Sequence, residues 1–577
     1  VPEYPRQELP DATKWDHTKW SPNYRNDNRI ETHESGTAPC KTACPAHVAV
    51  QGYLKLAAQS RYDEALALIK RENPLPAICG RVCNRRCEDA CTRGRVDAAV
   101  AIDEVKKFIA QRDLDAATRY VPPVVTPTRA GGFDQKIAII GAGPAGLSCA
   151  FYLAEKGYKP VVFEKNERPG GMLTYGIPSF KLQKDVIEAE VEIIRLMGAE
   201  FRYGVEVGRD VTLDELREQG FKAFYVAIGC QGGRLAGIPG EDAEDVTVAV
   251  DFLREVNSGK IDTLSGRTIV VGGGNVAIDV ARNACRLGSE HVEMFCLESE
   301  AQMPASEEER REAVEDGAHI SCGWGPKEIH LDEAGRVCGI TFKRCTRVFD
   351  DEGRFAPEYD ENDLRRVDAD RVVMSIGQSI VWGDLLAGSK VELGRGRGAL
   401  ADPQTYQTAE PDIFVGGDVY TGPSFAIDAI AAGHEAAVSI HRFVQPGSTL
   451  TIGRNQRRYT ALDRDDVVLE SYDNASREVA HVDREREKAA PFSEYVETFT
   501  EEQVRVETAR CLGCGASIVD PNKCIGCGLC TTKCAFDAIH LDRDRPECST
   551  MVKYEQKLPS LGKYALKRAI KIKFGRK

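Results

Sequence analysis

Four cysteines near the C-terminal end have a spacing that can hold an electron-transfer centre. They form the run C-x2-C-x2-C-x3-C, and they are Cys524, Cys527, Cys530 and Cys534. This is the spacing of bacterial ferredoxins, in which cysteine thiolates bind 4Fe–4S clusters. Ala535 stands where that run usually has a proline. The run therefore predicts at least one 4Fe–4S cluster here, and its chemistry would be the transfer of single electrons.

Three further cysteines, Cys511, Cys514 and Cys548, lie near this run. In two-cluster ferredoxins the fourth cysteine of the run serves the other cluster, and each cube takes about four thiolates. The seven cysteines cannot fill two cubes unless another residue also binds. One C-terminal cluster is therefore expected, and a second one is left open.

Six cysteines between residues 40 and 91 form a second group of potential metal ligands. They are Cys40, Cys44, Cys79, Cys83, Cys87 and Cys91. The last four recur at every fourth position, so on one straight helix they would span about 18 Å, more than one cube can bridge. Either the segment bends or these cysteines serve different sites. Zinc also accepts short cysteine spacings, but the absence of histidine pairs and the adjoining dinucleotide motif favour iron–sulfur clusters.

A glycine-rich segment between residues 135 and 164 has the pattern of a dinucleotide site. An apolar run at 137–140 predicts a buried strand, a helical pattern covers 147–156, and a second apolar run ends at Glu164. The glycines between strand and helix allow a tight turn and close approach of a pyrophosphate, and the acid can bind a ribose. The predicted contacts are Gly141, Gly143, Pro144, Ala145, Gly146 and Glu164.

Two later segments are expected to contact the flavin end of this dinucleotide, which would then be FAD. Gly170 and Gly171 permit close backbone approach and are followed by Met172. Gly417 and Asp418 lie between a strand and a helix, where the carboxylate can accept a hydrogen bond from a ribityl hydroxyl. The alternative for this second segment is a plain turn between strand and helix.

A second Rossmann pattern begins before the first is complete. It comprises a strand at 268–271, a helix at 275–287 and a second strand at 291–297. Two such units imply two dinucleotides, unless the second unit is degenerate and binds nothing. Its predicted nucleotide contacts are Gly272, Gly274, Asn275, Val276, Ala277 and Glu298. Glu298 has no adjoining basic residue, and because a 2′-phosphate needs arginine or lysine, NAD(H) is favoured over NADP(H).

These motifs need particular elements to position them, and they predict an α/β fold with two nested Rossmann-type dinucleotide-binding domains. An N-terminal α-helical iron–sulfur domain and a C-terminal ferredoxin-like α+β domain complete the fold. The apolar strand at 371–378 is predicted to return the chain to the first domain. The expected domains are 1–130 (helical iron–sulfur), 131–247 with 366–447 (FAD), 248–365 (NAD(H)), 448–508 (connector), 509–550 (ferredoxin-like) and 551–577 (basic tail).

Composition excludes several classes of protein. The net charge of −13 over 577 residues argues against a nucleic-acid partner. No apolar run reaches the roughly 18 residues that a membrane span needs. The stretch at 1–10 lacks the apolar centre of a signal peptide, so a reducing cytoplasmic location is expected for this cysteine-rich chain. The tail at 551–577 has nine Lys or Arg and one acid, which indicates either a solvated tail or a docking segment for an acidic partner.

The order of these motifs resembles that of the glutamate synthase small subunit and its relatives. These relatives include the flavoprotein part of dihydropyrimidine dehydrogenase and the large subunit of the NADH-dependent ferredoxin:NADP oxidoreductase. The motifs are GAGPAG at 141–146, GGMLTYGIPSFKL at 170–182, GGGNVAID at 272–279 and VGGDVYTGPS at 415–424. The resemblance implies FAD in the domain of Gly141, a nicotinamide in the domain of Gly272 and iron–sulfur clusters at the N-terminus.

Two departures from this family affect the N-terminal clusters. The family's first cysteine pair would fall near Thr32 and Ser35, and a family Glu or Gln ligand would fall near Lys106. The resemblance then implies one cluster held by Cys44, Cys79, Cys83 and Cys87, with Cys40 and Cys91 left as a remnant or an incomplete second site. The family's paired arginines correspond to Leu297 and Glu298, which also favours NAD(H).

The resulting hypothesis is an FAD-dependent NAD(H) oxidoreductase subunit that passes electrons through iron–sulfur clusters to a partner protein. No side chain is expected to act as a catalytic acid, base or nucleophile, because the flavin supplies the chemistry. No redox C-x-x-C lies beside the flavin motif, which argues against a disulfide reductase. Two alternatives are an electron-bifurcating subunit of a larger complex and a non-catalytic electron relay with an empty second Rossmann unit.

Overall fold

The computed structural model describes residues 36–125, 132–464, 472–515, 524–528, 530–531 and 553–574. The chain divides into a first unit, residues 1–516, and a second unit, residues 517–577. Each unit is described by itself. No helix of the described ranges is long and apolar enough to cross a membrane.

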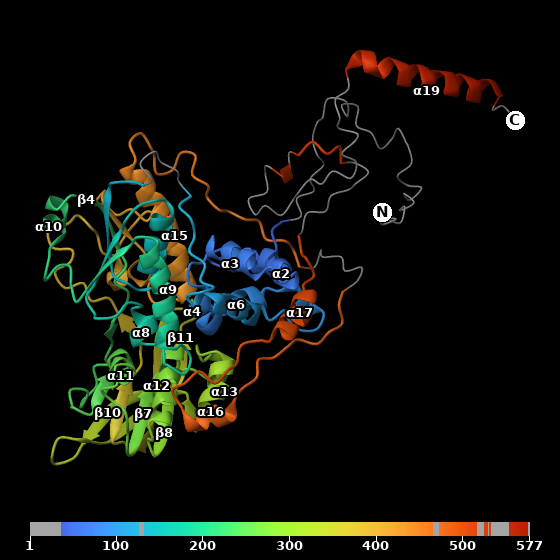
Figure 1. The fold of residues 1–577 in the computed structure, drawn as a ribbon. Helices are drawn as coiled ribbons and strands as arrows, with labels where there is room; N and C mark the ends of the chain where they lie inside the picture. The colour runs from blue at the N-terminus through green and yellow to red at the C-terminus, as the bar shows by residue number, and fades with distance from the viewer. Residues whose placement is uncertain are drawn as a thin grey trace. The chain divides into compact units, whose positions relative to one another are not determined.

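The first unit begins with short helices, drawn in blue in Figure 1. They are α1 (Pro39–Ala43), α2 (Val50–Ala58), α3 (Tyr62–Lys70), α4 (Pro76–Val82), α5 (Arg86–Asp89), η3 (Thr92–Arg95), α6 (Ile102–Ala110) and η4 (Gln111–Asp113). Helix α4 packs against α6, and α1 packs against α5. The cysteine segment bends, as one of the two sequence hypotheses required. Helix α4 ends at Val82, the next residue Cys83 is extended, and Arg85 has a left-handed φ of 53°.

A parallel sheet of five strands follows, in the order β15-β4-β1-β2-β3. Its strands are β1 (Lys136–Ile140), β2 (Val161–Glu164), β3 (Glu200–Tyr203), β4 (Phe221–Val226) and β15 (Ile413–Val415). Strands β1 and β4 are almost wholly buried, as expected for parallel strands covered on both faces. The helices of this domain are α7 (Pro144–Glu155), α8 (Met172–Tyr175), α9 (Lys184–Leu196), α10 (Leu213–Glu218), α14 (Asp418–Thr421) and α15 (Ala426–Val444). Helix α7 packs against α15.

A second parallel sheet has the order β6-β13-β7-β8-β9 and lies below the first in Figure 1. Its strands are β6 (Val246–Val248), β7 (Arg267–Val271), β8 (His291–Cys296), β9 (His319–Cys322) and β13 (Arg371–Met374). Its helices are α11 (Ala249–Asn257), α12 (Asn275–Arg286), η5 (Glu300–Gln302) and α13 (Glu307–Glu315). An antiparallel sheet flanks it, made of β10 (Trp324–Leu331), β11 (Val337–Phe349) and β12 (Phe355–Val367). The α/β fold with two nested Rossmann units is confirmed.

The strand predicted to return the chain to the first domain belongs to the second. Val373 of β13 pairs with Val270 of β7 and with Thr247 of β6. The FAD segments predicted at 131–247 and 366–447 therefore include strands of the other sheet. A short apolar strand buried on both faces carries no signal of the sheet it joins, which explains the error. The return occurs later, where β14 (Gln378–Ser379) pairs with β5 (Gly232–Gly233).

After α15 the chain passes over the outside of the first unit and back to the N-terminal helices. Thr37 forms a parallel bridge with Ala461, and α16 (Arg484–Ala489) and α17 (Glu501–Ala509) follow. Helix α17 packs against α2 and α6. Residues 509–515, predicted to open the ferredoxin-like domain, belong to this first unit instead. In the second unit most of residues 517–550 lie outside the described residues, and α19 (Tyr554–Phe574) is exposed from Tyr554 to Lys573.

Candidate functional site

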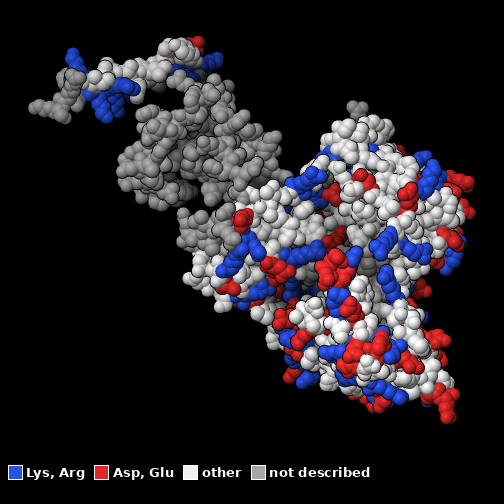
Figure 2. All heavy atoms as spheres, turned by 180° about the vertical axis from the view of Figure 1, so that it is seen from behind, with Lys and Arg blue, Asp and Glu red and all other residues white. Residues whose placement is uncertain are grey.

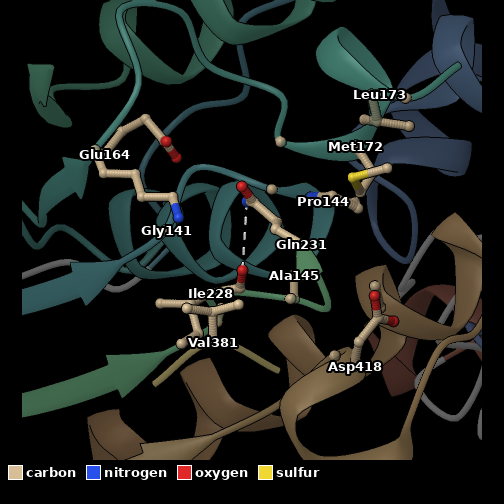
Figure 3. Close-up of a pocket in the computed structure, with 18 of the residues that line it drawn as sticks. Gly141, Pro144, Ala145, Glu164, Met172, Leu173, Ile228, Gln231, Val381 and Asp418 are labelled. Carbon is tan, nitrogen blue, oxygen red and sulfur yellow. Dashed lines mark hydrogen bonds between the residues drawn. The ribbon is translucent and has the colours of Figure 1, made fainter. Parts of the chain in front are cut away.

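A cavity of about 240 Å³ is lined by residues that follow the first sheet's strands β1, β2 and β15. Figure 3 shows it from close by. Nine of the eleven residues predicted to contact FAD line it, and they are Gly141, Gly143, Pro144, Ala145, Glu164, Gly171, Met172, Gly417 and Asp418. The two that do not, Gly146 and Gly170, pack behind it. Residues that lie as far apart in the sequence as Gly141 and Asp418, almost 280 positions, therefore line one cavity.

The three glycines of the first loop have different surroundings. Gly141 has a φ of 104°, and a Cβ there would lie 2.5 Å from the carbonyl oxygen of Ala227. At Gly146 a Cβ would lie 1.9 Å from the carbonyl oxygen of Gly141, so this glycine lets α7 approach β1. Gly143 has open space where its Cβ would be. The loop thus leaves room for a bulky group at Gly143 alone, which fits a pyrophosphate over the N-terminus of α7.

Glu164, at the end of β2, is buried and held firmly. Its Oε2 accepts a hydrogen bond from the backbone N–H of Ala142 at 2.8 Å, and its Oε1 accepts two from Asn166, at 2.9 Å from the backbone N and 2.6 Å from Nδ2. A carboxylate has about four acceptor positions. One is therefore left for a ribose hydroxyl, at an oxygen whose position is fixed.

Asp418 lies across the cavity from Glu164 in the view of Figure 3. It follows Gly417, whose φ of 66° turns the chain into α14. Its Oδ1 accepts a hydrogen bond from the backbone N–H of Ser424 at 3.2 Å, and burial raises the pKa of the carboxyl to about 6. This is the position expected of an acceptor for a flavin side-chain hydroxyl.

Three residues from the second Rossmann unit line the same cavity, and they are Leu253 of α11 with Val276 and Asp279 of α12. Lys181 Nζ lies 2.7 Å from Asp279 Oδ1 and also pairs with Glu309. Burial raises the pKa of Asp279 to about 6, against the effect of the Lys181 ammonium. The sequence analysis missed Asp279 and Lys181, because only the packing of α12 against the first domain reveals their roles.

The second glycine loop is also built around open space. A Cβ at Gly272 would lie 2.2 Å from the carbonyl oxygen of Ser375, whereas Gly274 has nothing within 4 Å of its would-be Cβ. Glu298 reaches over this loop, since its Oε2 lies 3.1 Å from the Cβ position of Gly273. Asn275 Oδ1 accepts a hydrogen bond from the backbone N–H of Ser306 at 3.2 Å, while Ala277 is buried.

Two arginines distant in sequence lie near Glu298. Arg310 Nη1 donates to the carbonyl oxygen of Glu300 at 2.6 Å, and its Nε has no hydrogen-bond partner among the described residues. The Arg344 guanidinium lies close to Gly323, whose N–H donates to the carbonyl oxygen of Glu298. The local sequence showed no base at this position, so these two side chains were missed.

Cys83 lies near three other N-terminal cysteines. The thiol of Cys83 interacts electrostatically with those of Cys44, Cys79 and Cys87. Lys106 is buried beside them and pairs with Asp103. Burial raises the pKa of each of the four thiols, and the Lys106 ammonium opposes this by favouring thiolates. These are the four cysteines that the family resemblance implied.

The remaining pair, Cys40 and Cys91, has two neighbours that the sequence analysis placed elsewhere. Cys511 and Cys514 line the same small cavity as Cys40 and Cys91. The sequence analysis left Cys40 and Cys91 as a remnant or an incomplete second site, and the structure places two further thiols beside them. In the second unit Cys524 and Cys527 are exposed and Cys530 is half-buried, whereas Cys534 lies outside the described residues.

Among the residues described, no three His, Cys, Asp or Glu side chains are placed to hold a single metal ion.

The chain matches three known protein families. Residues 135–433 match the family described as pyridine nucleotide-disulphide oxidoreductase. Residues 31–118 match dihydropyrimidine dehydrogenase domain II with its 4Fe–4S cluster, and residues 517–540 match a 4Fe–4S binding domain. Cys511 and Cys514 lie outside both 4Fe–4S matches.

Several curated proteins are similar over most of their length. The NADP(+)-dependent formate dehydrogenase subunit beta of Moorella thermoacetica is 35% identical over 83% of this chain and 70% of its own. The glutamate synthase [NADPH] small chain of Escherichia coli is 35% identical over 71% of this chain and 89% of its own. The NAD-dependent dihydropyrimidine dehydrogenase subunit PreT of Escherichia coli O157:H7 is 32% identical over 71% of this chain and 91% of its own.

Proposed function

The chain belongs to the pyridine nucleotide-disulphide oxidoreductase family, and from this premise we propose that it moves electrons between NADH and a partner protein. It is an NAD(P)H-dependent oxidoreductase with an FAD-binding domain and 4Fe–4S domains. The observation that carries the proposal is the shared cavity, where Gly143 of one Rossmann unit and Val276 of the other line one space. This arrangement lets the reactive rings of two dinucleotides meet.

FAD, when bound, supplies the conversion between a two-electron hydride from the nicotinamide and single electrons for clusters. The residues present fit this group, because Gly143 leaves a cradle that a Cβ would fill. Glu164 fixes the ribose hydroxyl through its remaining acceptor position, and the N-terminus of α7 stabilises the pyrophosphate charge. Asp418 accepts a hydrogen bond from the ribityl chain. The apolar lining, including Met172, Leu173 and Val381, excludes water from the ring.

The nicotinamide is proposed to be NAD(H). Glu298 reaches over the loop that begins at Gly272, where a carboxylate binds a free ribose and repels a 2′-phosphate. Arg310 and Arg344 lie at the edge of this site and would favour a phosphate, so Glu298 is the residue on which the preference depends. Similar proteins include both NAD- and NADP-dependent ones, which makes this position worth testing.

Two clusters complete the proposed path. Cys44, Cys79, Cys83 and Cys87 would hold one in the N-terminal helices, where Lys106 offsets the negative charge of the thiolates. Cys524, Cys527, Cys530 and Cys534 would hold the one in the ferredoxin match. The second unit is the proposed exit, because Cys524 and Cys527 are exposed and a partner could approach them.

The partner is proposed to be an acidic protein or subunit. Lys and Arg side chains are distributed along α19, as Figure 2 shows, and apolar Leu561, Tyr564 and Leu566 are exposed beside them. On the visible face of the first unit, bases and acids are intermixed. A helix with both charge and exposed apolar side chains fits a protein surface, and its charge would steer an acidic one.

A pair of glycine substitutions tests the proposed function. Gly143 and Gly274 have φ values of −76° and −89°, and neither has an atom within 4 Å of its would-be Cβ. Gly143→Val and Gly274→Val should therefore fold, yet fill the space needed by a pyrophosphate. Gly143→Val should lose FAD. Gly274→Val should keep FAD but lose its anaerobic reduction by NADH, measured by stopped-flow flavin bleaching.

Each glycine variant is the control for the other. If Gly274→Val is reduced by NADH at the wild-type rate, the second Rossmann unit does not deliver the hydride. Absence of bleaching in the wild type with either nicotinamide would instead favour a non-catalytic relay.

A further inference from the structure

We propose that Cys40, Cys91, Cys511 and Cys514 together hold a further 4Fe–4S cluster that joins the N-terminal helices to the end of the first unit. The electron-carrying role of this cluster rests on the function proposed above, but its ligand set does not. The set would give the chain three clusters, each with four cysteines of its own.

The four thiols meet in one small cavity, although Cys40 and Cys511 are separated by 470 intervening residues. The Cys40 thiol interacts electrostatically with those of Cys91, Cys511 and Cys514. The cavity is otherwise lined mainly by apolar side chains, among them Val50, Leu54 and Ile102. All four thiols are free and none is paired in a disulfide. Four convergent thiols in an apolar pocket are the donor set that iron–sulfur clusters use.

A buried network fixes the segment that carries Cys511. Arg510 is fully buried, and its Nη2 donates to the carbonyl oxygen of Ala98 at 2.6 Å and to Asp97 at 3.1 Å. Glu507, one turn earlier on α17, pairs with Arg510 and accepts a hydrogen bond from the N–H of Ala101 at 2.7 Å. A buried charged network of this kind is costly unless every member is satisfied. It holds the residues just before Cys511 against the loop that follows Cys91.

The turn between Cys511 and Cys514 is held from the other side. Gln51 Nε2 of α2 donates to the carbonyl oxygen of Cys514 at 2.5 Å. Gly513 has a φ of 65°, which lets the C-x-x-C turn reverse, and its N–H donates to the sulfur of Cys511. A backbone N–H directed at a cysteine sulfur is common around bound clusters. The pair is thus placed by specific contacts rather than left at a loose end.

A buried hydroxyl lies at this site. Thr92 follows Cys91, and its Oγ1 is buried close to the sulfur of Cys514. No other partner of this hydroxyl is found among the described residues. A cluster between these residues would present sulfur acceptors to Thr92.

This assignment also resolves the cysteine count at the C-terminal end. With Cys511 and Cys514 in the first unit, the ferredoxin run keeps Cys524, Cys527, Cys530 and Cys534 for a single cube. Cys511 and Cys514 would also replace the family's first cysteine pair, whose positions are taken here by Thr32 and Ser35. The prediction that Cys511 and Cys514 belong to the ferredoxin-like domain is therefore replaced.

The test is a cycle of paired substitutions in the full-length protein, purified anaerobically. Wild type should contain about twelve irons per chain, at about four per cluster. Cys40→Ser/Cys91→Ser and Cys511→Ser/Cys514→Ser should each lose about four irons and the same reduced-state EPR signal. The quadruple variant should lose no more than either pair, because all four residues serve one cluster.

The outcomes separate this proposal from its alternatives. Additive loss in the quadruple variant, with about four irons left, would mean two different clusters and overturn the inference. So would full iron content in either pair variant, or zinc in place of the lost iron. Cys285→Ser/Cys338→Ser, at two half-buried cysteines outside the site, is the matched control and should keep about twelve irons.

Two further measurements show whether the variants fold. FAD absorbance should be unchanged in both pair variants. If the quadruple variant does not fold, loss of the same EPR signal in both pair variants still shows that the four cysteines serve one cluster. Thr92→Val should keep the iron but lower the cluster's midpoint potential, because a hydrogen bond to sulfur stabilises the reduced state. Thr92→Ser should restore it. None of these measurements depends on NADH or on a partner.

Discussion

Lys181 Nζ lies 2.7 Å from Asp279 Oδ1, and this ion pair joins the segment after α8 to the helix that opens the second Rossmann unit. Both groups are largely buried, and Asp279 lines the flavin cavity. The pair is therefore placed to hold α12 at a set position relative to the flavin site. A small displacement between donor and acceptor rings lowers the rate of a reaction that depends on their alignment.

Lys181→Met should slow flavin reduction by NADH several-fold while FAD and iron contents stay at wild-type levels. The substitution also raises the pKa of Asp279 above about 6, since it removes the neighbouring cation. Stopped-flow bleaching measures the rate. Lys327→Met, which breaks an exposed pair with Glu361, is the control and should leave it unchanged. An unaffected rate in Lys181→Met would show that the pair does not position α12.

Asp418→Asn should remove a pH dependence of stability in the FAD-free protein. Burial raises the pKa of Asp418 from 3.8 to about 6, so the folded state holds this proton more tightly than the unfolded state does. Stability is then lost as pH rises from about 4 through about 6. Between pH 5 and 7 the loss is about 1 kcal/mol. Denaturant unfolding measures the free energy of unfolding at both pH values. Its loss between pH 5 and 7 should be smaller in the variant by about 1 kcal/mol.

Glu298→Arg should weaken use of NADH and improve use of NADPH. The arginine would replace a ribose acceptor with a partner for the 2′-phosphate, beside Arg310 and Arg344. We expect the ratio of kcat/KM values for the two cofactors to shift by at least tenfold, or about 1.4 kcal/mol. Steady-state kinetics with an artificial acceptor provide the measurement. A wild-type preference for NADPH would contradict the role given to Glu298.

Cys527→Ser should stop electron transfer to the partner while the flavin is still reduced. The ferredoxin run holds the proposed exit cluster, and loss of one thiolate removes or alters it. Flavin bleaching and partner reduction are followed in the same anaerobic experiment. Wild-type partner reduction by this variant would mean that electrons leave through a cluster of the first unit.

Charge reversal on α19 should slow partner reduction in a salt-dependent way. Lys563, Lys567 and Lys571 recur at every fourth position of this exposed helix. Replacing all three with Glu should reduce the rate of association with an acidic partner, and the difference should shrink as salt rises. Arg347→Glu/Arg354→Glu, at exposed positions of the first unit, is the control. A difference that is insensitive to salt would exclude electrostatic steering by α19.

Local pattern was sufficient to predict most of the two glycine loops. At Gly141 and Gly272 a side chain would collide with the carbonyl that directly follows a neighbouring strand of the sheet, and Gly143 and Gly274 face open space. These roles follow from strand, turn and helix within about 30 residues, so they can be read along the chain. Glu164 and Asp418 were found for the same reason, since Glu164 ends a short apolar strand and Asp418 follows another after two glycines.

Contacts between distant segments could not be predicted in this way. Strand β13 was assigned to the wrong sheet because its buried residues look the same in either sheet. Arg344 reaches the Glu298 region from β11, and no local pattern announces it. Cysteine spacing predicted Cys511 and Cys514 as ligands, but their sequence proximity to Cys524 did not show that they lie beside Cys40 and Cys91.

Short patterns of residue type and spacing were enough to predict the kind of chemistry: two glycine-rich dinucleotide loops, an acid after each of them, and cysteine clusters. These patterns can be read along the chain because the backbone geometry of a tight turn restricts the residues that fit it. Which elements meet depends on the tertiary fold. Helix α12 closes the flavin cavity, and the return of the chain past α17 brings Cys511 and Cys514 to Cys40 and Cys91. Such meetings depend on the packing of whole helices and on buried networks such as that of Arg510, which no short stretch of sequence encodes.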